Sequence, residues 1–434
     1  MNEPLLPAAE PALAPPLPGL WKNRDFVKLW SGQTISELGS RITREGIPWT
    51  AVLVLHAGPV QMGFLAALGG AAMLVFGLVA GVWVDRLRRR PILIAADLGR
   101  AAILVSVPAA AVAGVLSMGQ LYTVVARAGI LTVFFDVAYQ SYLPALVERG
   151  QILEGNSKLA LSSSIAEIAG PGVTGLLVQL ITAPIAILID AVSFLVSALT
   201  VALIRKPEPA AEPREPEHLV TETLAGVRFI FGEPRLRALG LRSATMFFFM
   251  GFFGSTYMLY AINVLHLRTA LLGVVIAMGG VGAMAGSVVA PRIVQRFGLG
   301  RTFVVTSLVQ GLTSLLIPLA GLVGTPGTVQ LFAVACMMVP QLFGDMAFMV
   351  YNINEITLRQ TVAPEQVLGR VNAGMNLLAR GIWPIGSLIG GFLAAALGLR
   401  ATLALAAAGV VLSTLWLLAS PLRRLGQAGY IAAP

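Results

Sequence analysis

The chain of 434 residues is 56% hydrophobic and carries only 12% charged residues, and its mean hydropathy is +0.81. A soluble protein has about 25% charged residues, so this chain has too few charges to cover a surface that faces water. Its apolar residues fall in blocks of roughly 20, the length that crosses a ~30 Å hydrocarbon core. We therefore predict an all-α polytopic membrane protein. This excludes a soluble enzyme, a secreted disulfide scaffold and a nucleic-acid-binding domain, although the net charge is +9.

Hydropathy along the chain predicts twelve transmembrane helices. Residues 1–20 are rich in Pro and Ala, lack the pattern of a signal peptide, and are expected to form a disordered cytoplasmic tail. The polar stretch 205–236 contains a Pro- and Glu-rich linker from Lys206 to His218 and an amphipathic segment from Leu219 to Phe231. It separates an N-terminal six-helix bundle, 21–204, from a C-terminal six-helix bundle, 237–422, which a cytoplasmic tail, 423–434, follows. The predicted helices lie at about 28–55, 62–84, 92–114, 119–146, 157–181, 184–204, 237–264, 269–291, 301–323, 328–354, 370–396 and 400–421.

Lys and Arg residues are distributed unequally between the two ends of these helices. The segments on the side of the linker hold 22 of them, whereas the opposite loops hold only Arg268 and Arg400. Because short loops rich in Lys and Arg stay in the cytoplasm, both termini and the linker are predicted to be cytoplasmic. The preference for Arg over Lys, with much Ala and Gly, is typical of a GC-rich bacterial genome and predicts location in a bacterial inner membrane.

Two sequence patterns recur at corresponding positions of the halves. The fourth helix contains FFDVAYQSY at 134–142 and the tenth contains FGDMAFMVY at 343–351, an offset of 209. GPG at 170–172 in the fifth helix corresponds to WPIG at 383–386 in the eleventh, at an offset of 213. Duplicated halves with the same orientation predict two bundles related by a pseudo-twofold axis along the membrane normal, with a substrate site between them near the midplane.

The segment between the second and third helices reads GVWVDRLRRRP at 81–91 and resembles the loop signature G-x-x-x-D-R-x-G-R-R/K of the major facilitator superfamily, with Arg88 in place of the second glycine. GPGVTG at 170–175 is similar to the G-P-x-x-G antiporter motif of exporters. The resemblance covers about 21–420, implies the major facilitator fold, and is best to the subfamily of macrolide efflux proteins and the enterobactin exporter. It also includes DAVSF at 190–194, LRQ at 358–360 with Pro364, GRVN at 369–372, and Pro384.

The resemblance implies gating positions near the cytoplasmic ends of the helices. Asp85 would be attracted to the positive N-terminal end of the eleventh helix, which begins near Arg370, and would hold the halves together in an outward-open state. Alanine replaces the aspartate in the second half, at GSVVA 286–290, so the contact is expected to be one-sided. The alternative is that the arginine-rich loop supplies only positive charge. The other gating or structural positions are Gly81, Arg86, Arg89, Arg90, Gly170, Pro171, Gly175 and Pro384.

The first helix carries four ionisable residues, Glu37, Arg41, Arg44 and Glu45. At 100° per residue they lie in one stripe, together with Gln33 and Pro48. An ionisable group at the bilayer centre costs roughly 2.5–3.5 kcal/mol on insertion scales, so the stripe is expected to line a water-filled cavity. The acids and bases can pair with one another along the helix. Alternatively, these side chains contact the substrate or bind protons.

The fourth helix carries Arg127 and Asp136, which are nine residues apart and therefore point in opposite directions. Asp136 has a repeat-related copy, Asp345, whereas Cys336 occupies the position that corresponds to Arg127. A feature present in both halves favours a structural or gating role for the two aspartates. The resemblance implies that Arg127 takes part in proton coupling, because many exporters of the superfamily carry an arginine on this helix.

Glu167 and Arg380 each lie four residues before a proline, Pro171 and Pro384, at equivalent depths of the fifth and eleventh helices. One turn from a helix kink suits a gate or a coupling carboxylate. Glu167 is predicted to carry the proton, with Glu37 and Glu45 next. A fixed ion pair with Arg127 or with an arginine of the first helix is the alternative.

These features predict a secondary active transporter, a proton-coupled exporter (antiporter) of amphiphilic compounds such as macrolide-like drugs or siderophores, working by alternating access. Its partners would be a small amphiphilic substrate, protons and the lipid bilayer, with no nucleic acid, and the protein would be a monomer. Arg41, Arg44 and Arg380 would suit an anionic group on the substrate. No metal cluster, phosphate loop or nucleophile–base pair is recognisable, so no metal, cofactor or enzymatic activity is predicted. A lipid or lysophospholipid flippase or facilitator, and a transporter-like membrane sensor, are the alternatives.

Overall fold

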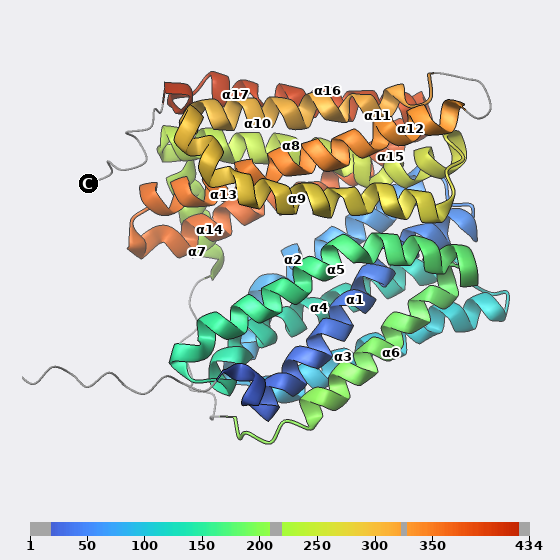
Figure 1. Ribbon diagram of the computed structural model, residues 1–434, viewed down its shortest axis with the longest axis vertical. Helices are drawn as coiled ribbons and strands as arrows, with labels where there is room; N and C mark the ends of the chain where they lie inside the picture. The colour runs from blue at the N-terminus through green and yellow to red at the C-terminus, as the bar shows by residue number, and fades with distance from the viewer. Residues whose placement is uncertain (1–18, 209–218, 323–327, 425–434) are drawn as a thin grey trace, which may run out of the picture.

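The computed structural model describes residues 19–208, 219–322 and 328–424 (Figure 1). The predicted tails, apart from their innermost residues, and most of the Pro- and Glu-rich linker lie outside these ranges. Every regular element of the described part is helical. The N-terminal half consists of the turns η1 (Leu20–Lys22) and η2 (Arg149–Gln151) and the helices α1 (Arg24–Leu53), α2 (Pro59–Arg86), α3 (Arg89–Val112), α4 (Met118–Leu146), α5 (Ile152–Ile181) and α6 (Ala183–Ala202).

The C-terminal half also crosses six times, but several of its passages are divided into two helices. The short helix α7 (Leu219–Gly232) occupies the predicted amphipathic segment. The six passages are α8 (Pro234–Leu259) with the π-helix η3 (Tyr260–Val264); α9 (Thr269–Phe297); α10 (Leu299–Ser314) with α11 (Leu316–Leu319); α12 (Thr328–Val339), the π-helix η4 (Pro340–Gly344) and α13 (Asp345–Val362); α14 (Glu365–Arg380) with α15 (Trp383–Leu397); and α16 (Leu399–Leu412) with α17 (Leu415–Leu418), followed by the turn η5 (Pro421–Arg424).

Eleven helical stretches of the described residues are long and apolar enough to cross a membrane. The remaining passage is α1, whose 30 residues correspond to about 45 Å at 1.5 Å per residue. It is long enough to cross, and the predicted charged stripe sets it apart from the other passages. The fold is therefore an all-α polytopic bundle of two six-helix halves, as the sequence predicts.

The helices of both halves run between two ends of the molecule, which we call the linker end and the far end. The linker end holds the start of α1, the end of α6, and α7; the far end holds the connections α1–α2 and α8–α9. Figure 1 shows the N-terminal half below and the C-terminal half above, meeting at the far end and diverging toward the linker end.

Glycines permit the close approach of the halves toward the far end. A Cβ placed on Gly63 of α2 would lie 3.1 Å from the Cα of Gly391 in α15, and one on Gly175 of α5 would lie 3.0 Å from the Cα of Gly273 in α9. The α5–α9 contact continues toward the middle of the bundle, where Gly280 lies against Ile168. A Cβ on Gly81, near the linker end of α2, would have no described atom within 4 Å. The halves are therefore closed together at the far end.

A second set of glycines orients α1. Gly32, Gly39 and Gly46 recur every seven residues and all lie against α6, where Gly39 meets Ser193 and Gly46 meets Ile187. Small residues of this kind let helices pack at short separation. Because this face is occupied by α6, the charged stripe of α1 is directed toward α5 and the space between the halves.

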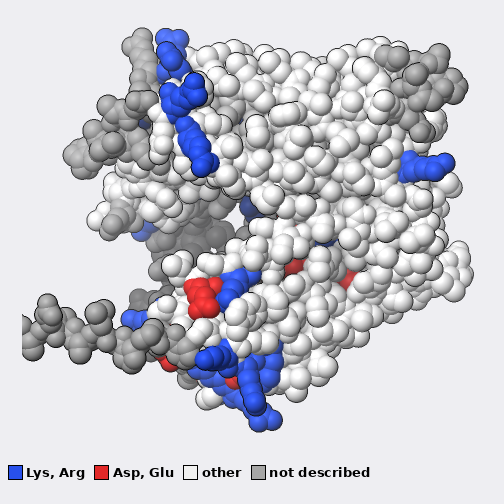
Figure 2. Space-filling model, viewed as in Figure 1, with Lys and Arg blue, Asp and Glu red and all other residues white. Residues whose placement is uncertain are grey.

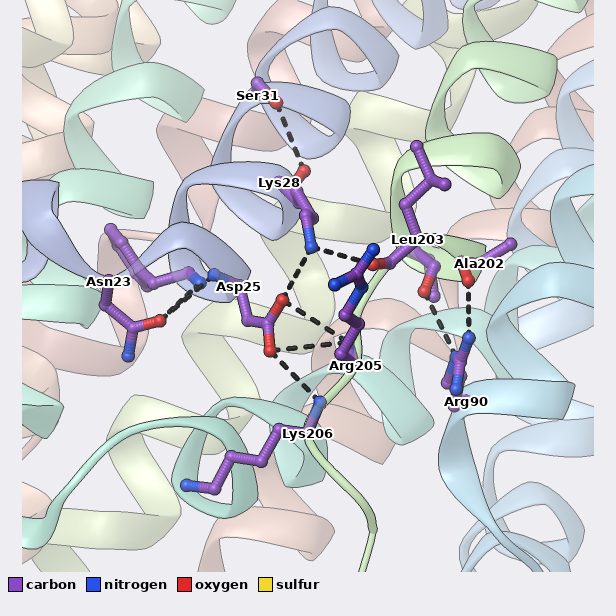
Figure 3. A network of polar contacts seen from close by, with 11 residues as sticks. Asn23, Asp25, Lys28, Ser31, Arg90, Ala202, Leu203, Arg205 and Lys206 are labelled. Carbon is purple, nitrogen blue, oxygen red and sulfur yellow. Dashed lines mark hydrogen bonds and ion pairs between the residues drawn. The ribbon is translucent and has the colours of Figure 1, made fainter.

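The start of the linker is attached to the N-terminal half (Figure 3). The Asp25 carboxylate accepts hydrogen bonds from Lys28 Nζ at 2.7 Å and from the backbone N–H of Lys206 at 3.0 Å. Glu208 accepts from the backbone N–H groups of Arg89, at 2.6 Å, and Arg90, at 3.1 Å. The start of α1 and the first residues of α3 therefore hold residues 205–208 in place.

The helix that follows the linker belongs to the other half. Gly226 of α7 lies against the backbone carbonyl of Arg370 in α14, where a Cβ would not fit, and Ile230 is fully buried among residues of the C-terminal half. The chain is thus fixed to the N-terminal half before the linker and to the C-terminal half after it.

Candidate functional site

The charged stripe of α1 meets Glu167 of α5 between the halves. Glu167 Oε1 lies 3.0 Å from Arg44 Nη2, and Glu167 Oε2 forms an ion pair with Arg41. Arg41 also lies 3.7 Å from Glu37, one turn earlier, and Arg44 lies 4.0 Å from Glu45. Five of the residues singled out from the sequence therefore form one network of alternating charges.

The fifth helix makes room for this network through Gly170. A Cβ on Gly170 would lie 2.5 Å from the Cβ of Arg41, so only glycine allows the arginine side chain to pass across α5. The next residue, Pro171, has its carbonyl against Gly273 of α9, and Gly175 continues the same contact. The GPGVTG segment thus packs α5 against α1 on one side and against α9 on the other. Unlike the eleventh passage, α5 runs unbroken through its proline.

Glu167 lies beside the contact between α5 and α9. The glycine contacts between the two helices reach from Gly175 to Ile168 on the α5 side, and Glu167 is the next residue toward the linker end. Its side chain is 48% exposed, so part of the carboxylate is not covered by the described residues. Figure 2 shows acidic and basic side chains recessed along the seam between the halves, on a face that is otherwise mostly uncharged.

A cavity of about 270 Å³ lies between the halves on the far-end side of this network. The N-terminal half contributes Glu45 and Pro48 of α1, and the C-terminal half contributes apolar and aromatic side chains, with Tyr257 hydrogen-bonded to Gln341 at 3.2 Å. Two acidic residues, Glu45 and Asp345, therefore line one largely apolar chamber. The remaining lining residues are Met250, Phe253, Gly254, Met258, Ile276, Gln310, Ser314, Ile317, Pro340 and Gly344.

Asp345 is placed in this cavity by an irregularity of the tenth passage. The π-helix η4 ends at Gly344, directly before Asp345, and π-segments of this kind are frequent at functional sites. The Asp345 carboxylate lies against Gly279 of α9, where a Cβ would clash. In the N-terminal half α4 is continuous through the repeat-related Asp136, and Asp136 does not line the cavity. The two aspartates thus correspond in sequence but differ in surroundings.

A second, polar pocket of about 380 Å³ lies within the N-terminal half. Gln33, Thr34 and Glu37 of α1 face Tyr139 and Gln140 of α4 across it. The α5 side of this pocket is lined by Asn156, Leu159, Ala160, Ser162 and Ser163. The stripe of α1 therefore passes from this pocket, through the ion pairs with Glu167, to the cavity between the halves.

Two predicted site residues stand apart from the network. Arg127 of α4 and Arg380, the last residue of α14, are both exposed. Among the described residues, no hydrogen bond or ion pair joins either guanidinium to Glu167 or to another acid. The sequence allowed an ion pair of Glu167 with Arg127 or with an arginine of the first helix. The structure shows the pairs with Arg41 and Arg44.

The loop signature between α2 and α3 contacts its own half. Arg90 donates to the backbone carbonyls of Val201, at 3.2 Å, and Ala202, at the end of α6 (Figure 3). Arg89 lies 3.6 Å from Glu208, while Arg86 is exposed. The Asp85 side chain is outside the described part, so its predicted contact with the start of the eleventh passage near Arg370 stays a prediction.

Sequence analysis missed one buried cation in each half. Arg100 of α3 forms an ion pair with Asp97 at 2.5 Å and lies over the rings of Phe135 and Phe194, 4.3 and 4.0 Å from their centroids. Asp190 of α6, also buried, accepts a hydrogen bond from Ser193 at 2.9 Å.

In the C-terminal half, the fully buried Arg242 of α8 donates to Ser307 at 3.3 Å and to Gln310 at 2.6 Å. It lies over the Tyr351 ring at 3.8 Å. Both arginines could have been identified from the sequence, because each is a cation inside a predicted span, where a charge requires a partner.

Comparison with known proteins agrees with the resemblance seen in the motifs. The sequence profile of the Major Facilitator Superfamily matches residues 29–385. The chain is 28% identical over 376 residues to the multidrug efflux pump Tap of Mycolicibacterium fortuitum, covering 84% of this chain and 88% of that protein. It is 30% identical over 189 residues to macrolide efflux protein A of Streptococcus pyogenes, covering 43% and 46% respectively.

Solved structures share the fold at low sequence identity. A bacterial homologue of the iron transporter ferroportin in its inward-facing state superposes with a TM-score of 0.71 at 17% identity, covering 91% of this chain and 98% of that one. The nucleoside transporter NupG has a TM-score of 0.69 at 14% identity, covering 92% and 98%. The predicted fold and subfamily resemblance are confirmed. The chain belongs to the Major Facilitator Superfamily, and it is a multi-pass membrane transporter rather than an enzyme.

Proposed function

We propose that the protein is a proton-coupled exporter in which Glu167 exchanges its arginine partners for a proton. The observation that carries this proposal is the position of Glu167 beside the α5–α9 contact, with one ion pair to Arg41 and one to Arg44. If α5 and α9 separate as the halves rock, the surroundings of this carboxylate change. A proton that neutralises Glu167 would release both arginines and so link protonation to the movement of α1 against α5.

We further propose that the substrate is an amphiphilic molecule with a basic group. Arg41 and Arg44 are engaged by Glu167, and Glu45 lies 4.0 Å from Arg44. Of the charged residues that line the cavity, Asp345 has no ion pair among the described residues, and its charge is therefore the one offered to a ligand. Phe253 and Tyr257 add aromatic surface, which favours a cation through the ring quadrupole as well as an apolar body. This favours basic macrolide-like drugs and cationic dyes over anionic siderophores, and it accords with the multidrug and macrolide efflux activities named for the relatives.

The proposed direction of transport rests on the orientation that the loop charges predict. With the linker end in the cytoplasm, the arrangement in which the halves diverge there would collect substrate from the cytoplasm or the inner leaflet. Rocking of the halves about the central cavity would then open the far end. Substrate release outside and proton uptake there would complete an antiport cycle.

Proton flux in proteoliposomes tests the proposal. Purified protein is reconstituted with an internal pH dye and an imposed pH gradient, and a macrolide with a basic sugar, ethidium, a catechol siderophore and a lysolipid are added in turn. We expect proton flux with the macrolide and with ethidium in the wild-type protein, and none in Glu167→Gln. Glu154→Gln, on the same helix but hydrogen-bonded at the linker end, is the matched control and should retain wild-type flux.

Each negative result removes a different part of the proposal. Flux that persists in Glu167→Gln would remove this residue as the proton carrier. Flux with only the siderophore would overturn the basic substrate, and flux with only the lysolipid would favour a flippase. Ligand binding by thermal shift without any flux would favour a facilitator.

A further inference from the structure

A groove within the C-terminal half runs along α10, between α9, α13 and α17. Its cavity volume is about 510 Å³, and all of its lining residues belong to 293–423, so it is separate from the cavity between the halves. Phe297 and Val305 are 52% and 55% exposed and form its open edge. The groove begins at the linker end, where Arg301 and Arg423 line it.

The wall of the groove offers almost no polar group beyond these two arginines. Its two threonines donate their hydroxyl hydrogens within their own helix, Thr302 to the Gly298 carbonyl at 2.8 Å and Thr306 to the Thr302 carbonyl at 2.6 Å. The other side chains along the wall are aliphatic or aromatic. An occupant of the wall must therefore be apolar.

The mouth of the groove, in contrast, is strongly basic. Within the described residues, no hydrogen bond or ion pair engages the guanidinium of Arg301 or of Arg423. The end of α9 adds Arg292 and Arg296. Figure 2 shows basic side chains gathered at the linker end of the C-terminal half without an acidic one between them on this face.

No acid of the neighbouring elements compensates these charges. The sequence contains no Asp or Glu between Glu233 and Asp345, and none after Glu365. On α13, Asp345 faces the central cavity, and Glu355 is buried next to Arg359 at 3.4 Å. The mouth of the groove therefore carries an uncompensated positive charge, which favours an anionic ligand.

We propose that this groove binds one anionic phospholipid from the leaflet at the linker end, with the phosphate between Arg301 and Arg423 and an acyl chain along α10. From Arg301 to Val309 the groove follows eight residues of helix, about 12 Å at 1.5 Å per residue, which is close to the ~15 Å thickness of one leaflet. Basic pockets between transmembrane helices on the cytoplasmic side are suited to such headgroups. A free anion would use the two arginines but would leave the apolar wall without a ligand.

Native mass spectrometry of the purified full-length protein tests this site. The protein in a neutral detergent is titrated with dioleoyl phosphatidylglycerol and, in parallel, with dioleoyl phosphatidylcholine. We expect one tightly retained phosphatidylglycerol and no equivalent retention of phosphatidylcholine. At about 1 kcal/mol for each basic residue, Arg301→Gln with Arg423→Gln should weaken phosphatidylglycerol binding roughly 30-fold.

The matched control is the double variant Arg268→Gln with Arg400→Gln, which removes the same charge at the far end and should bind like the wild type. Val305→Trp keeps the arginines and fills the open edge of the groove, so it should also weaken binding; this variant serves if the double variant fails to fold. Equal phosphatidylglycerol retention by all variants would overturn the site. Equal retention of phosphatidylcholine, or displacement of the lipid by millimolar inorganic phosphate, would overturn the anionic-lipid assignment.

Discussion

Glu167 of α5 is shared by two arginines of α1 that differ in their exposure to solvent. The Arg41 side chain is 12% exposed, whereas the Arg44 side chain is 54% exposed. An ion pair that is shielded from water is less screened than one at an open surface. The pair with Arg41 is therefore the stronger link between the two helices, and the pair with Arg44 is the one that water can replace.

This difference predicts unequal effects of neutralising the two arginines. Arg41→Gln removes a charge-assisted bond in a shielded place, where such bonds contribute about 1.5–3 kcal/mol, and it should slow substrate efflux by about tenfold or more. Arg44→Gln removes an exposed pair, for which about 0.2–1 kcal/mol is usual, and should slow efflux no more than about fivefold. Initial rates of ethidium efflux from cells with matched protein levels measure both. A larger loss in Arg44→Gln would contradict the assignment.

The close contact between α2 and α15 predicts that glycine is required on both helices at the far end. A Cβ on Gly63 would lie 2.8 Å from the Ser387 carbonyl oxygen, and one on Gly391 would lie 2.7 Å from the Pro59 carbonyl oxygen, so an added side chain would push the two helices apart. Gly63→Ala with Gly391→Ala should therefore disfavour this arrangement of the halves and slow ethidium efflux from cells with matched protein levels. Gly58→Ala with Gly232→Ala, where a Cβ meets no described atom within 4 Å, is the matched control and should keep wild-type efflux; an equal loss in both variants would contradict the role of the close contact.

The two acids of the central cavity predict a charge-selective effect on ligand binding. Asp345→Asn should weaken the binding of ethidium about tenfold, as expected for loss of one interaction with a charged partner. A neutral ligand of similar size should bind as before. Asp136→Asn is the matched control, because this repeat-related residue does not line the cavity. Fluorescence titration in detergent gives the dissociation constant of ethidium for each variant. An equal loss of ethidium affinity in the two variants would contradict a direct contact with Asp345.

Much of this fold was predictable because the bilayer fixes the length of its elements. Blocks of about 20 apolar residues located eleven passages. The twelfth, α1, was also predicted although charged residues interrupt it, and the stripe on α1 predicted which residues gather with Glu167. The sequence predicted a kink near both Pro171 and Pro384, but the structure divides only the eleventh passage, at Gly381 and Ile382, and leaves α5 unbroken. The π-helix before Asp345 was not predicted. Both depend on how a proline is accommodated by neighbouring helices.

Other parts of the site could not be predicted because their partners are distant in sequence. The contact of Arg242 with Gln310 joins residues 68 positions apart, and no local pattern specifies it. The repeat relation between Asp136 and Asp345 suggested one shared role, but η4 alters the helix directly before Asp345 alone. Arg127 and Arg380, which the motifs and symmetry favoured, lie apart from the charge network of α1 and α5.

The buried contacts of Arg242 predict a structural role for this residue. Arg242→Met should leave Gln310 without its donor and Tyr351 without its cation, and we expect a loss of about 2–4 kcal/mol in unfolding free energy. Arg237→Met, on the same helix, is the matched control and should cost much less. Thermal unfolding in detergent, followed by tryptophan fluorescence, compares the two variants. Equal melting temperatures would contradict the stabilising role of the buried guanidinium.

The attachment of the linker at both ends limits how far the two halves can travel. Glu208 accepts hydrogen bonds from the start of α3, and α7, beyond the linker, is packed on α14. Only the eleven Cα steps from Glu208 to Leu219 can bridge any change in separation, and at about 3.5 Å each they reach roughly 38 Å when fully extended. The linker is thus a tether whose length sets an upper bound on the opening of the transporter at this end.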